Sequence, residues 1–262
     1  RGKKPPYSHI YISLHMKKNS FRKIFRIVWF SLVGLFMTWQ FGTYQPRGID
    51  KTLFQTDDEV KVINDEAKIS FFHASAPKVN ILFFPGGLVS SKSYTPLAYN
   101  LSRAGYNVHI IKMPWRMSTK GYNLIKELFD LDDPNRIFVL GGHSQGGKMA
   151  AQFVYENPSL ISALFLMGTS HPRDYDMSHL AIPTLKVYAE HDGLASVGEV
   201  RQNQKLLPPN AQLSLIKGGN HTQFAYTGRL LMDGKATISR KEQQNQSLNV
   251  LLEYLDRVIG NN

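Results

Sequence analysis

Short apolar runs alternate with amphipathic segments along most of this chain. Eight runs have the length of strands, and the run at residues 163–167 is apolar at every position, as in a strand buried on both faces of a sheet. These runs span residues 59–64, 67–73, 79–84, 107–113, 136–140, 163–167, 184–189 and 212–217. Segments with a helical spacing of apolar residues lie between and after them, at residues 94–104, 122–131, 145–156, 196–206 and 243–259.

The order of these elements predicts the fold class. Only Asp65 and Glu66 separate the first two runs, which indicates a hairpin. From the third run onward strands alternate with helices, the arrangement of a parallel sheet with crossover helices. We therefore expect an α/β domain over residues 59–262, with an eight-stranded, mostly parallel sheet flanked by helices.

The N-terminal part of the chain has a different pattern. Basic residues at positions 17, 18, 22, 23 and 26 precede an apolar stretch over residues 27–39. Cations followed by an apolar stretch are typical of an export signal or a membrane anchor. Bulky residues follow the stretch where a signal-peptide cleavage site needs small ones. We expect an uncleaved signal-anchor over residues 16–41, with the C-terminal domain extracytoplasmic; a secreted, cleaved form is the alternative.

Two flanking segments complete the expected organisation. Met16 resembles a natural start, so residues 1–15 are expected to be an unstructured upstream extension. Residues 42–58 contain Gly, Thr, Gln and Pro and are expected to be a linker.

The net charge of +11 has a local origin. Eight of the 31 basic residues and none of the 20 acidic residues lie in the first 41 positions. The remaining chain is nearly balanced, so no nucleic-acid partner is expected. The charge instead strengthens the prediction that the N-terminal segment contacts a membrane.

A possible nucleophile lies between a predicted strand and a predicted helix. The sequence Gly142-His143-Ser144-Gln145-Gly146 follows the run at 136–140 and opens the helix at 145–156. Gly-x-Ser-x-Gly at such a junction is typical of a strained turn that projects the serine hydroxyl above the sheet. The positions two before and two after the serine approach each other, so both must be small. We interpret Ser144 as a nucleophile.

A nucleophilic serine needs a base and an orienting carboxylate, and both follow predicted strands here. Asp192 comes after the strand at 184–189, and His221 comes after the strand at 212–217. Loops at the carboxyl ends of strands are where open α/β sheets build their sites. We expect Asp192 as the acid and His221 as the base, with Glu190 as the alternative acid.

The other histidines are assigned different places. His143 is expected to pack beneath the turn rather than accept the proton, and His171 to line the pocket. The remaining ones are interpreted as loop, structural or exposed residues: His73, His109, His179 and His191.

An oxyanion hole requires backbone N–H donors near the nucleophile. One is expected from Gln145, the residue after Ser144, and the other from the glycine loop after the strand at 79–84. Glycine lets the backbone approach a substrate oxygen closely. We assign the second donor to Gly87, with Leu88 as the alternative.

These motifs together resemble the α/β-hydrolase superfamily, in particular its small, nearly lidless branch of dienelactone-hydrolase-like enzymes. The resemblance covers about residues 59–260 and rests on residues 84–87, 142–147, Asp192 and 219–221. It implies the α/β-hydrolase fold. Dienelactone hydrolases use a cysteine nucleophile, whereas this chain has Ser144 and no cysteine, so that specific activity is not carried over.

The expected function is hydrolysis of a small-molecule carboxylic ester or thioester through a Ser-His-Asp triad, without a metal or organic cofactor. Only 16 residues separate the sixth and seventh predicted strands, so we expect an open site. Peptidase or acyltransferase activity remains open, as does a non-catalytic, membrane-anchored binding protein on the same fold. Candidate pocket residues are Leu88, Trp115, Arg116, Met117, His171 and Phe224.

Overall fold

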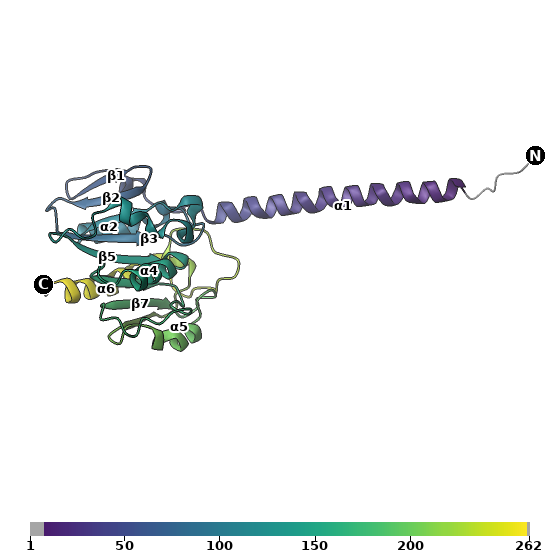
Figure 1. The fold of residues 1–262 in the computed structure, drawn as a ribbon. Helices are drawn as coiled ribbons and strands as arrows, with labels where there is room; N and C mark the ends of the chain where they lie inside the picture. Colours follow the sequence, from purple (N-terminus) through teal and green to yellow (C-terminus); the bar gives the residue numbers. More distant parts are fainter. Residues whose placement is uncertain (1–7, 261–262) are drawn as a thin grey trace, which may run out of the picture. The chain divides into compact units, whose positions relative to one another are not determined.

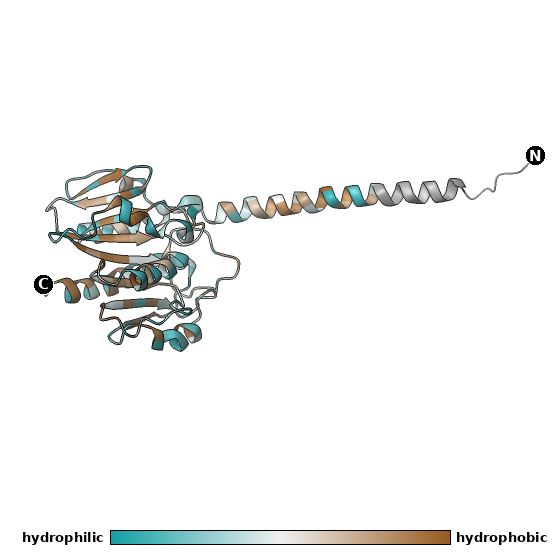
Figure 2. Ribbon diagram, in the orientation of Figure 1, coloured by the Kyte–Doolittle hydropathy of each residue, from teal (hydrophilic) through white to brown (hydrophobic). Residues whose placement is uncertain are grey.

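The computed structural model describes residues 8–260 and divides them into two units, one ending at Thr43 and one beginning at Tyr44. The N-terminal unit is the single helix α1, Ser8–Thr43. Its part from Ser20 to Thr43 is long and apolar enough to cross a membrane, by length and composition. Figure 2 shows predominantly apolar residues in this part of the helix.

The helix begins earlier than the sequence analysis expected. Its backbone includes residues 8–15, for which we expected no regular structure, while residues 1–7 of that segment lie outside the described residues. The reason is local, because residues 8–33 contain neither proline nor glycine. Within the expected linker, Arg47 N–H donates to the Tyr226 carbonyl, and the Tyr44 carbonyl accepts the Ser90 N–H.

The second unit contains one eight-stranded sheet with the order β1-β2-β4-β3-β5-β6-β7-β8 (Figure 1). The strands are β1 Val60–Asn64, β2 Lys68–His73, β3 Val79–Phe84, β4 Asn107–Ile111, β5 Ile137–His143, β6 Ala163–Met167, β7 Thr184–Ala189 and β8 Gln212–Ile216. β2 is antiparallel to both β1 and β4, and every other neighbouring pair is parallel. The predicted hairpin and mostly parallel sheet are confirmed.

Helices cover both faces of this sheet. The α-helices are α2 Thr95–Arg103, α3 Ile125–Leu128, α4 Gln145–Glu156, α5 Val197–Asn203 and α6 Arg240–Ile259. The 3-10 helices are η1 Lys51–Phe54, η2 Ser91–Tyr94, η3 Pro114–Arg116, η4 Ser118–Lys120, η5 Tyr122–Leu124, η6 Gln204–Leu206 and η7 Thr222–Phe224. Leu101 of α2 and Leu255 of α6 belong to one buried cluster, and Phe153 of α4 belongs to the other. The sheet therefore separates two cores.

Capping and pairing explain where the elements depart from prediction. α6 starts at Arg240 because the Ser239 side chain accepts the Glu242 N–H, and α5 starts after a capping box formed by Ser196 and Glu199. β5 continues to His143, beyond the expected end at residue 140, because it keeps pairing with β6 to Met167. The expected helix at 122–131 is reduced to η5 and α3.

One charged side chain is completely buried in the sheet. Lys186 is 0 % exposed on β7, and its ammonium donates to the His171 carbonyl. Burial lowers the pKa of Lys186 from 10.5 to about 7. No carboxylate forms an ion pair with it among residues 8–260. The position therefore costs the fold stability whenever the ammonium is charged.

This cost predicts the behaviour of Lys186→Met. Between pH 7 and 10.5, Lys186 is protonated in the unfolded chain but loses its proton in the folded protein, so the free energy of unfolding rises with pH. Below pH 7 the ammonium is charged in both states, and the full cost of burying it is present. Replacing a buried ion pair by apolar side chains is often neutral or stabilising by about 1–4 kcal/mol, and Lys186 is desolvated without a carboxylate partner's attraction within residues 8–260. We expect a higher Tm at pH 7 and a smaller rise towards pH 10, measured by circular dichroism. The exposed control Lys205→Met should change neither. A lower Tm for Lys186→Met at every pH would contradict the account.

Candidate active site

Ser144 occupies a strained turn between β5 and α4. Its φ of 55° and ψ of −119° lie in a region that non-glycine residues rarely adopt. Its N–H donates to the carbonyl of Met167 on β6, at 2.9 Å, and its carbonyl accepts from Lys148 N–H, at 3.0 Å. Sheet and helix thus hold both sides of the turn. This is the backbone geometry that the Gly-x-Ser-x-Gly motif predicts.

The two glycines of the motif lie where no side chain fits. A Cβ on Gly142 would lie 2.5 Å from the carbonyl carbon of Gly146. A Cβ on Gly146 would lie 2.5 Å from the carbonyl carbon of Phe84, at the end of β3. Three backbone segments therefore meet at the elbow, and only glycine allows them to come so close.

His221 and Asp192 form a buried pair beside this turn. His221 Nδ1 donates to the Asp192 carboxylate, with distances of 2.9 Å to Oδ2 and 3.1 Å to Oδ1. The side chains are 2 % and 0 % exposed. Asp192 Oδ1 also accepts the N–H groups of Leu194 and Ala195, at 2.8 and 2.6 Å. The carboxylate is thereby fixed and assigns the Nδ1–H tautomer to the imidazole, which leaves Nε2 available as a base.

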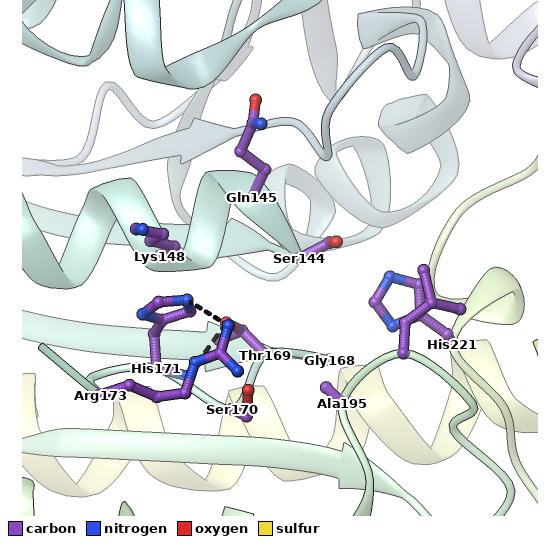
Figure 3. A pocket seen from close by; sticks show the side chains of 11 residues that line it. Ser144, Gln145, Lys148, Gly168, Thr169, Ser170, His171, Arg173, Ala195 and His221 are labelled. Carbon is purple, nitrogen blue, oxygen red and sulfur yellow. Dashed lines mark hydrogen bonds between the residues drawn. The ribbon is translucent and has the colours of Figure 1, made fainter. Parts of the chain in front are cut away.

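Ser144 and His221 line the same two cavities, of about 320 and 380 Å³. Figure 3 shows both side chains at one of these cavities. Within residues 8–260, no hydrogen bond joins the Ser144 hydroxyl to His221. Catalytic hydrogen bonds of this kind are often long before substrate binds and tighten in the reacting complex.

The alternative acid, Glu190, has a different place. It is exposed, and its Oε2 accepts the Gly218 N–H at 2.8 Å, so it ties the end of β7 to the loop after β8. His191 strengthens the same connection, because its N–H donates to the Gly219 carbonyl at 2.8 Å. Of the two carboxylates that the sequence left open, Asp192 is the one that contacts the His221 ring.

The glycine loop after β3 leaves one N–H free to bind substrate. Gly86 N–H donates to the Tyr94 hydroxyl at 2.9 Å, and Leu88 N–H donates to the Arg116 carbonyl at 2.7 Å. The Gly87 N–H has no acceptor among the described residues. Gln145 N–H, at the first position of α4, likewise has none within them. The hydrogen bonding therefore favours Gly87 over Leu88 as an oxyanion donor.

Tyr94 and His143 support this loop from below. The Tyr94 hydroxyl lies 2.8 Å from His143 Nδ1 and accepts the Gly86 N–H, so its own proton is directed to Nδ1. Burial, and then the neighbouring His221, hold the pKa of His143 well below its usual value, so it stays neutral. The His143 ring packs against His221 with centroids 4.6 Å apart. His143 thus packs beneath the turn, as the sequence analysis expected.

Asp233 is a buried carboxylate that the sequence reasoning missed. It is 3 % exposed, and its Oδ1 accepts the N–H groups of Gly193 and His221, both at 3.2 Å. Its Oδ2 accepts the Thr222 N–H at 2.7 Å. Asp233 therefore fastens the loop carrying the acid to the loop carrying the histidine. In the sequence, Met232-Asp233-Gly234 looks like an ordinary surface turn, so no signal was available.

The Gln145 side chain forms a second connection that was missed. Its Oε1 accepts the Ser118 N–H at 3.1 Å, while the Ser118 hydroxyl donates to the Pro85 carbonyl at 2.8 Å. A Cβ on Gly87 would lie 3.2 Å from the Gln145 side chain. The glycine loop that contains Gly87 and the start of α4 at Gln145 therefore contact each other, and both are hydrogen-bonded to Ser118 of η4.

The structure separates the candidate pocket residues into two groups. Leu88 and Met117 line the 380 Å³ cavity, and His171 lines the 320 Å³ cavity. Trp115 and Arg116 line neither; Trp115 is 87 % exposed, and Arg116 donates to Gln45 Oε1 at 3.4 Å. Phe224 does not line them either, because η7 directs its ring into the core, 5.6 Å from the ring of His143.

The remaining histidines lie away from Ser144. His109 is buried and contacts Ser70 Oγ at 2.9 Å and Asn80 Oδ1 at 3.3 Å, and burial lowers its pKa to about 3. His73 contacts Ser75 Oγ at 2.7 Å, and His179 is exposed. Between β6 and β7, residues 168–183 contain no helix, which agrees with the expected absence of a large lid. No cluster of three or more potential metal ligands occurs among the described residues.

The Asp192–His221 contact predicts the effect of changing either carboxylate. Asp192→Asn should lower kcat for a 4-nitrophenyl ester by up to about 10⁴-fold, because an amide favours the wrong imidazole tautomer. Glu190→Gln is the matched control and should keep most of the activity, since its side chain contacts Gly218 instead. Steady-state kinetics on both variants measure the difference. A mild Asp192→Asn together with a crippled Glu190→Gln would show that the acid is misassigned.

Comparison with known proteins is consistent with this arrangement. Residues 80–245, more than half of the chain, match the alpha/beta hydrolase family, whereas no curated protein matches the sequence. Similar folds occur in an alpha/beta hydrolase from a Mar Chica lagoon sediment metagenome (17 % identity, TM-score 0.57, covering 75 % of this chain and 98 % of that one).

Two further solved structures have the same fold. One is dienelactone hydrolase from Anabaena variabilis (16 % identity, TM-score 0.55, covering 76 % of this chain and 99 % of that one). The other is a soluble variant of monoglyceride lipase from Saccharomyces cerevisiae (14 % identity, TM-score 0.56, covering 81 % of this chain and 99 % of that one). At these identities the likeness establishes the fold alone. The family match covers the strand that precedes Ser144, the elbow, and the loops that carry Asp192 and His221. Because it also covers more than half of the sequence, the chain belongs to the alpha/beta hydrolase family.

Proposed function

We propose that this protein is a serine hydrolase that cleaves a carboxylic ester or thioester through an acyl-enzyme. The observation that carries the proposal is the buried Asp192–His221 pair, which lines the same cavities as a serine held at a strained elbow. Among the structural neighbours, a monoglyceride lipase and a dienelactone hydrolase are named for ester substrates, which supports this reaction class.

Each residue has one role in the proposed mechanism. His221 Nε2 accepts the Ser144 proton as the hydroxyl oxygen attacks the acyl carbon. Asp192 orients His221 and stabilises the imidazolium that forms. The N–H groups of Gln145 and Gly87 bind the oxyanion. His221 then protonates the leaving group and activates the water that releases the acyl group from Ser144. The same machinery serves amide hydrolysis and acyl transfer, so those activities remain alternatives.

Ser144→Ala tests this mechanism. The variant should lower kcat for a 4-nitrophenyl ester by about 10⁴-fold or more, because the oxyanion hole and substrate binding alone leave only residual catalysis. Circular dichroism should show an unchanged fold, since alanine adds no atom to the turn. A folded variant with a tenth of the wild-type rate would contradict the proposed nucleophile. A folded wild-type protein inactive on esters and thioesters of every chain length would favour the non-catalytic alternative.

We also propose that α1 anchors the protein in a membrane. In this proposal residues 16–41 form the anchor, residues 42–58 the connecting segment and residues 59–262 the hydrolase domain. The apolar helical stretch from Ser20 to Thr43 supports this, and the basic residues that precede position 27 set its orientation. By the positive-inside rule these cations stay cytoplasmic, so the hydrolase domain is extracytoplasmic.

The anchor predicts the fractionation of the protein. Full-length protein should pellet with membranes, and deletion of residues 16–41 should move it to the soluble fraction, because the apolar stretch is then missing. Protease added to cells stripped of their outer layers should digest the domain. Protein found in the soluble fraction without the deletion would contradict the anchor and favour a cleaved signal. A hydrolase domain that the protease digests only after the cells are lysed would reverse the proposed orientation.

A further inference from the structure

Two cavities of opposite character adjoin Ser144. The apolar cavity, of about 380 Å³, is lined by the side chains of Leu88, Val89, Met117, Leu194 and Leu230 among others. The cationic pocket, of about 320 Å³, is lined by Lys148, Thr169, Ser170, His171 and Arg173 together with residues of the triad region. Ser144, Gln145, Leu194 and His221 line both. A substrate attacked by Ser144 can therefore extend into two different environments.

The charged side chains that line the cationic pocket are Lys148 and Arg173, and no carboxylate lines it. Figure 3 shows Lys148, His171 and Arg173 grouped on one side of Ser144, away from His221. Arg173 Nη2 donates to His171 Nε2 at 3.3 Å. Burial lowers the pKa of His171 to about 4, so this imidazole is neutral at physiological pH and accepts that hydrogen bond. The positive charge of the pocket comes from the lysine and the arginine.

Both cations also have carboxylate partners outside the pocket lining. Lys148 Nζ lies 3.7 Å from Asp174, and Arg173 Nη1 lies 3.4 Å from Glu199. The carboxylate side chains are 70 % and 42 % exposed, and ion pairs in such positions contribute little because water screens them. A substrate anion inside the pocket can compete with these partners, and the Thr169 and Ser170 hydroxyls line the same space.

The position of the oxyanion donors orients the two parts of an ester. Gly87 lines only the apolar cavity, whereas Gln145 lines both. When these two N–H groups bind the carbonyl oxygen, the apolar cavity beside Gly87 has room and apolar side chains for the acyl chain. The cationic pocket is then left for the alcohol part, and His221, which lines both cavities, can reach the leaving oxygen to protonate it.

We propose that the cationic pocket binds a carboxylate or phosphate group on the alcohol part of the substrate, while the apolar cavity holds the acyl chain. The substrate class is thus an ester of an apolar acid with an anionic alcohol. This inference rests on the proposed function and narrows it. Arg173 provides a planar pair of donors for an oxyanion, and Lys148 provides a point charge.

Two matched chromogenic esters test the proposal on the full-length protein. Both carry a pentanoyl group; the leaving group is 4-hydroxy-3-nitrobenzoate in one and the neutral 4-hydroxy-3-nitrobenzamide in the other. The kcat/KM of each ester is divided by its rate constant for hydroxide-catalysed hydrolysis, because the two leaving groups differ in reactivity. The measured quantity is the ratio of this normalised kcat/KM for the anionic ester to that for the neutral ester. We expect a ratio of about ten or more, the effect of one charge-assisted hydrogen bond, and a decrease of this ratio with added salt.

Charge variants then locate the effect. Arg173→Gln and Lys148→Gln should each lower the ratio, whereas Asp174→Asn and Glu199→Gln should raise it, because they remove competing carboxylates. Lys241→Gln, an exposed position on α6, is the control and should leave the ratio unchanged. Because each variant is measured on both esters, partial loss of folded protein cancels in the ratio. A third pentanoyl ester carries a phosphonate in place of the carboxylate on its leaving group. If its ratio to the neutral ester exceeds that of the carboxylate ester, the pocket prefers a phosphate-bearing alcohol; if it is smaller, the pocket prefers a carboxylate-bearing one.

The outcomes separate this inference from the proposed function. A wild-type ratio near or below one, or a ratio that Arg173→Gln and Lys148→Gln do not change, would overturn the cationic pocket and leave the hydrolase intact. A preference for an anion on the acyl part, measured with 4-nitrophenyl hemiglutarate against 4-nitrophenyl pentanoate, would overturn the assigned orientation. A folded protein that hydrolyses none of these esters would overturn the proposed function itself.

Discussion

The close approach of three backbone segments at the elbow is the constraint on which the site depends. The end of β3, the end of β5 and the start of α4 meet where Gly142 and Gly146 have no room for a Cβ. This packing holds Ser144 at a φ of 55°, a conformation that the surrounding sheet and helix must impose. The same approach brings the glycine loop after β3 next to the start of α4. The proposed nucleophile and the two proposed oxyanion donors are thus products of one packing arrangement.

A carboxylate partner distinguishes His221, the proposed base, from the equally buried His143. His143 and His221 pack together, yet only His221 has a carboxylate partner, and that partner is itself held by two backbone N–H groups. His143 Nδ1 instead accepts a hydrogen bond from the Tyr94 hydroxyl, and the ring stays neutral. An imidazolium on His143 would be buried without compensation, whereas one on His221 would lie beside Asp192. Two adjacent imidazoles thereby acquire separate tasks, one structural and one suited to proton transfer.

The sequence predicted the parts of the site that depend on local pattern. Strand, turn and helix around Ser144 follow from apolar periodicity and the glycine spacing, and the loops of Asp192 and His221 follow directly after their strands. Asp233 and Tyr94 were not predictable, because their roles depend on contacts with loops that are distant in sequence. Phe224 was a candidate pocket residue, but η7 directs its ring into the core, a placement that depends on tertiary packing rather than on local pattern.

The central claim is that Ser144 is a nucleophile activated by His221, and covalent capture tests it most directly. Full-length protein is treated with a fluorophosphonate, and the modified residue is identified by mass spectrometry of its peptides. The account predicts a single phosphonylated residue, Ser144, and loss of this labelling in His221→Ala, because the serine then lacks its base. Folded wild-type protein that stays unlabelled at Ser144, or that is labelled there equally well without His221, would contradict the account.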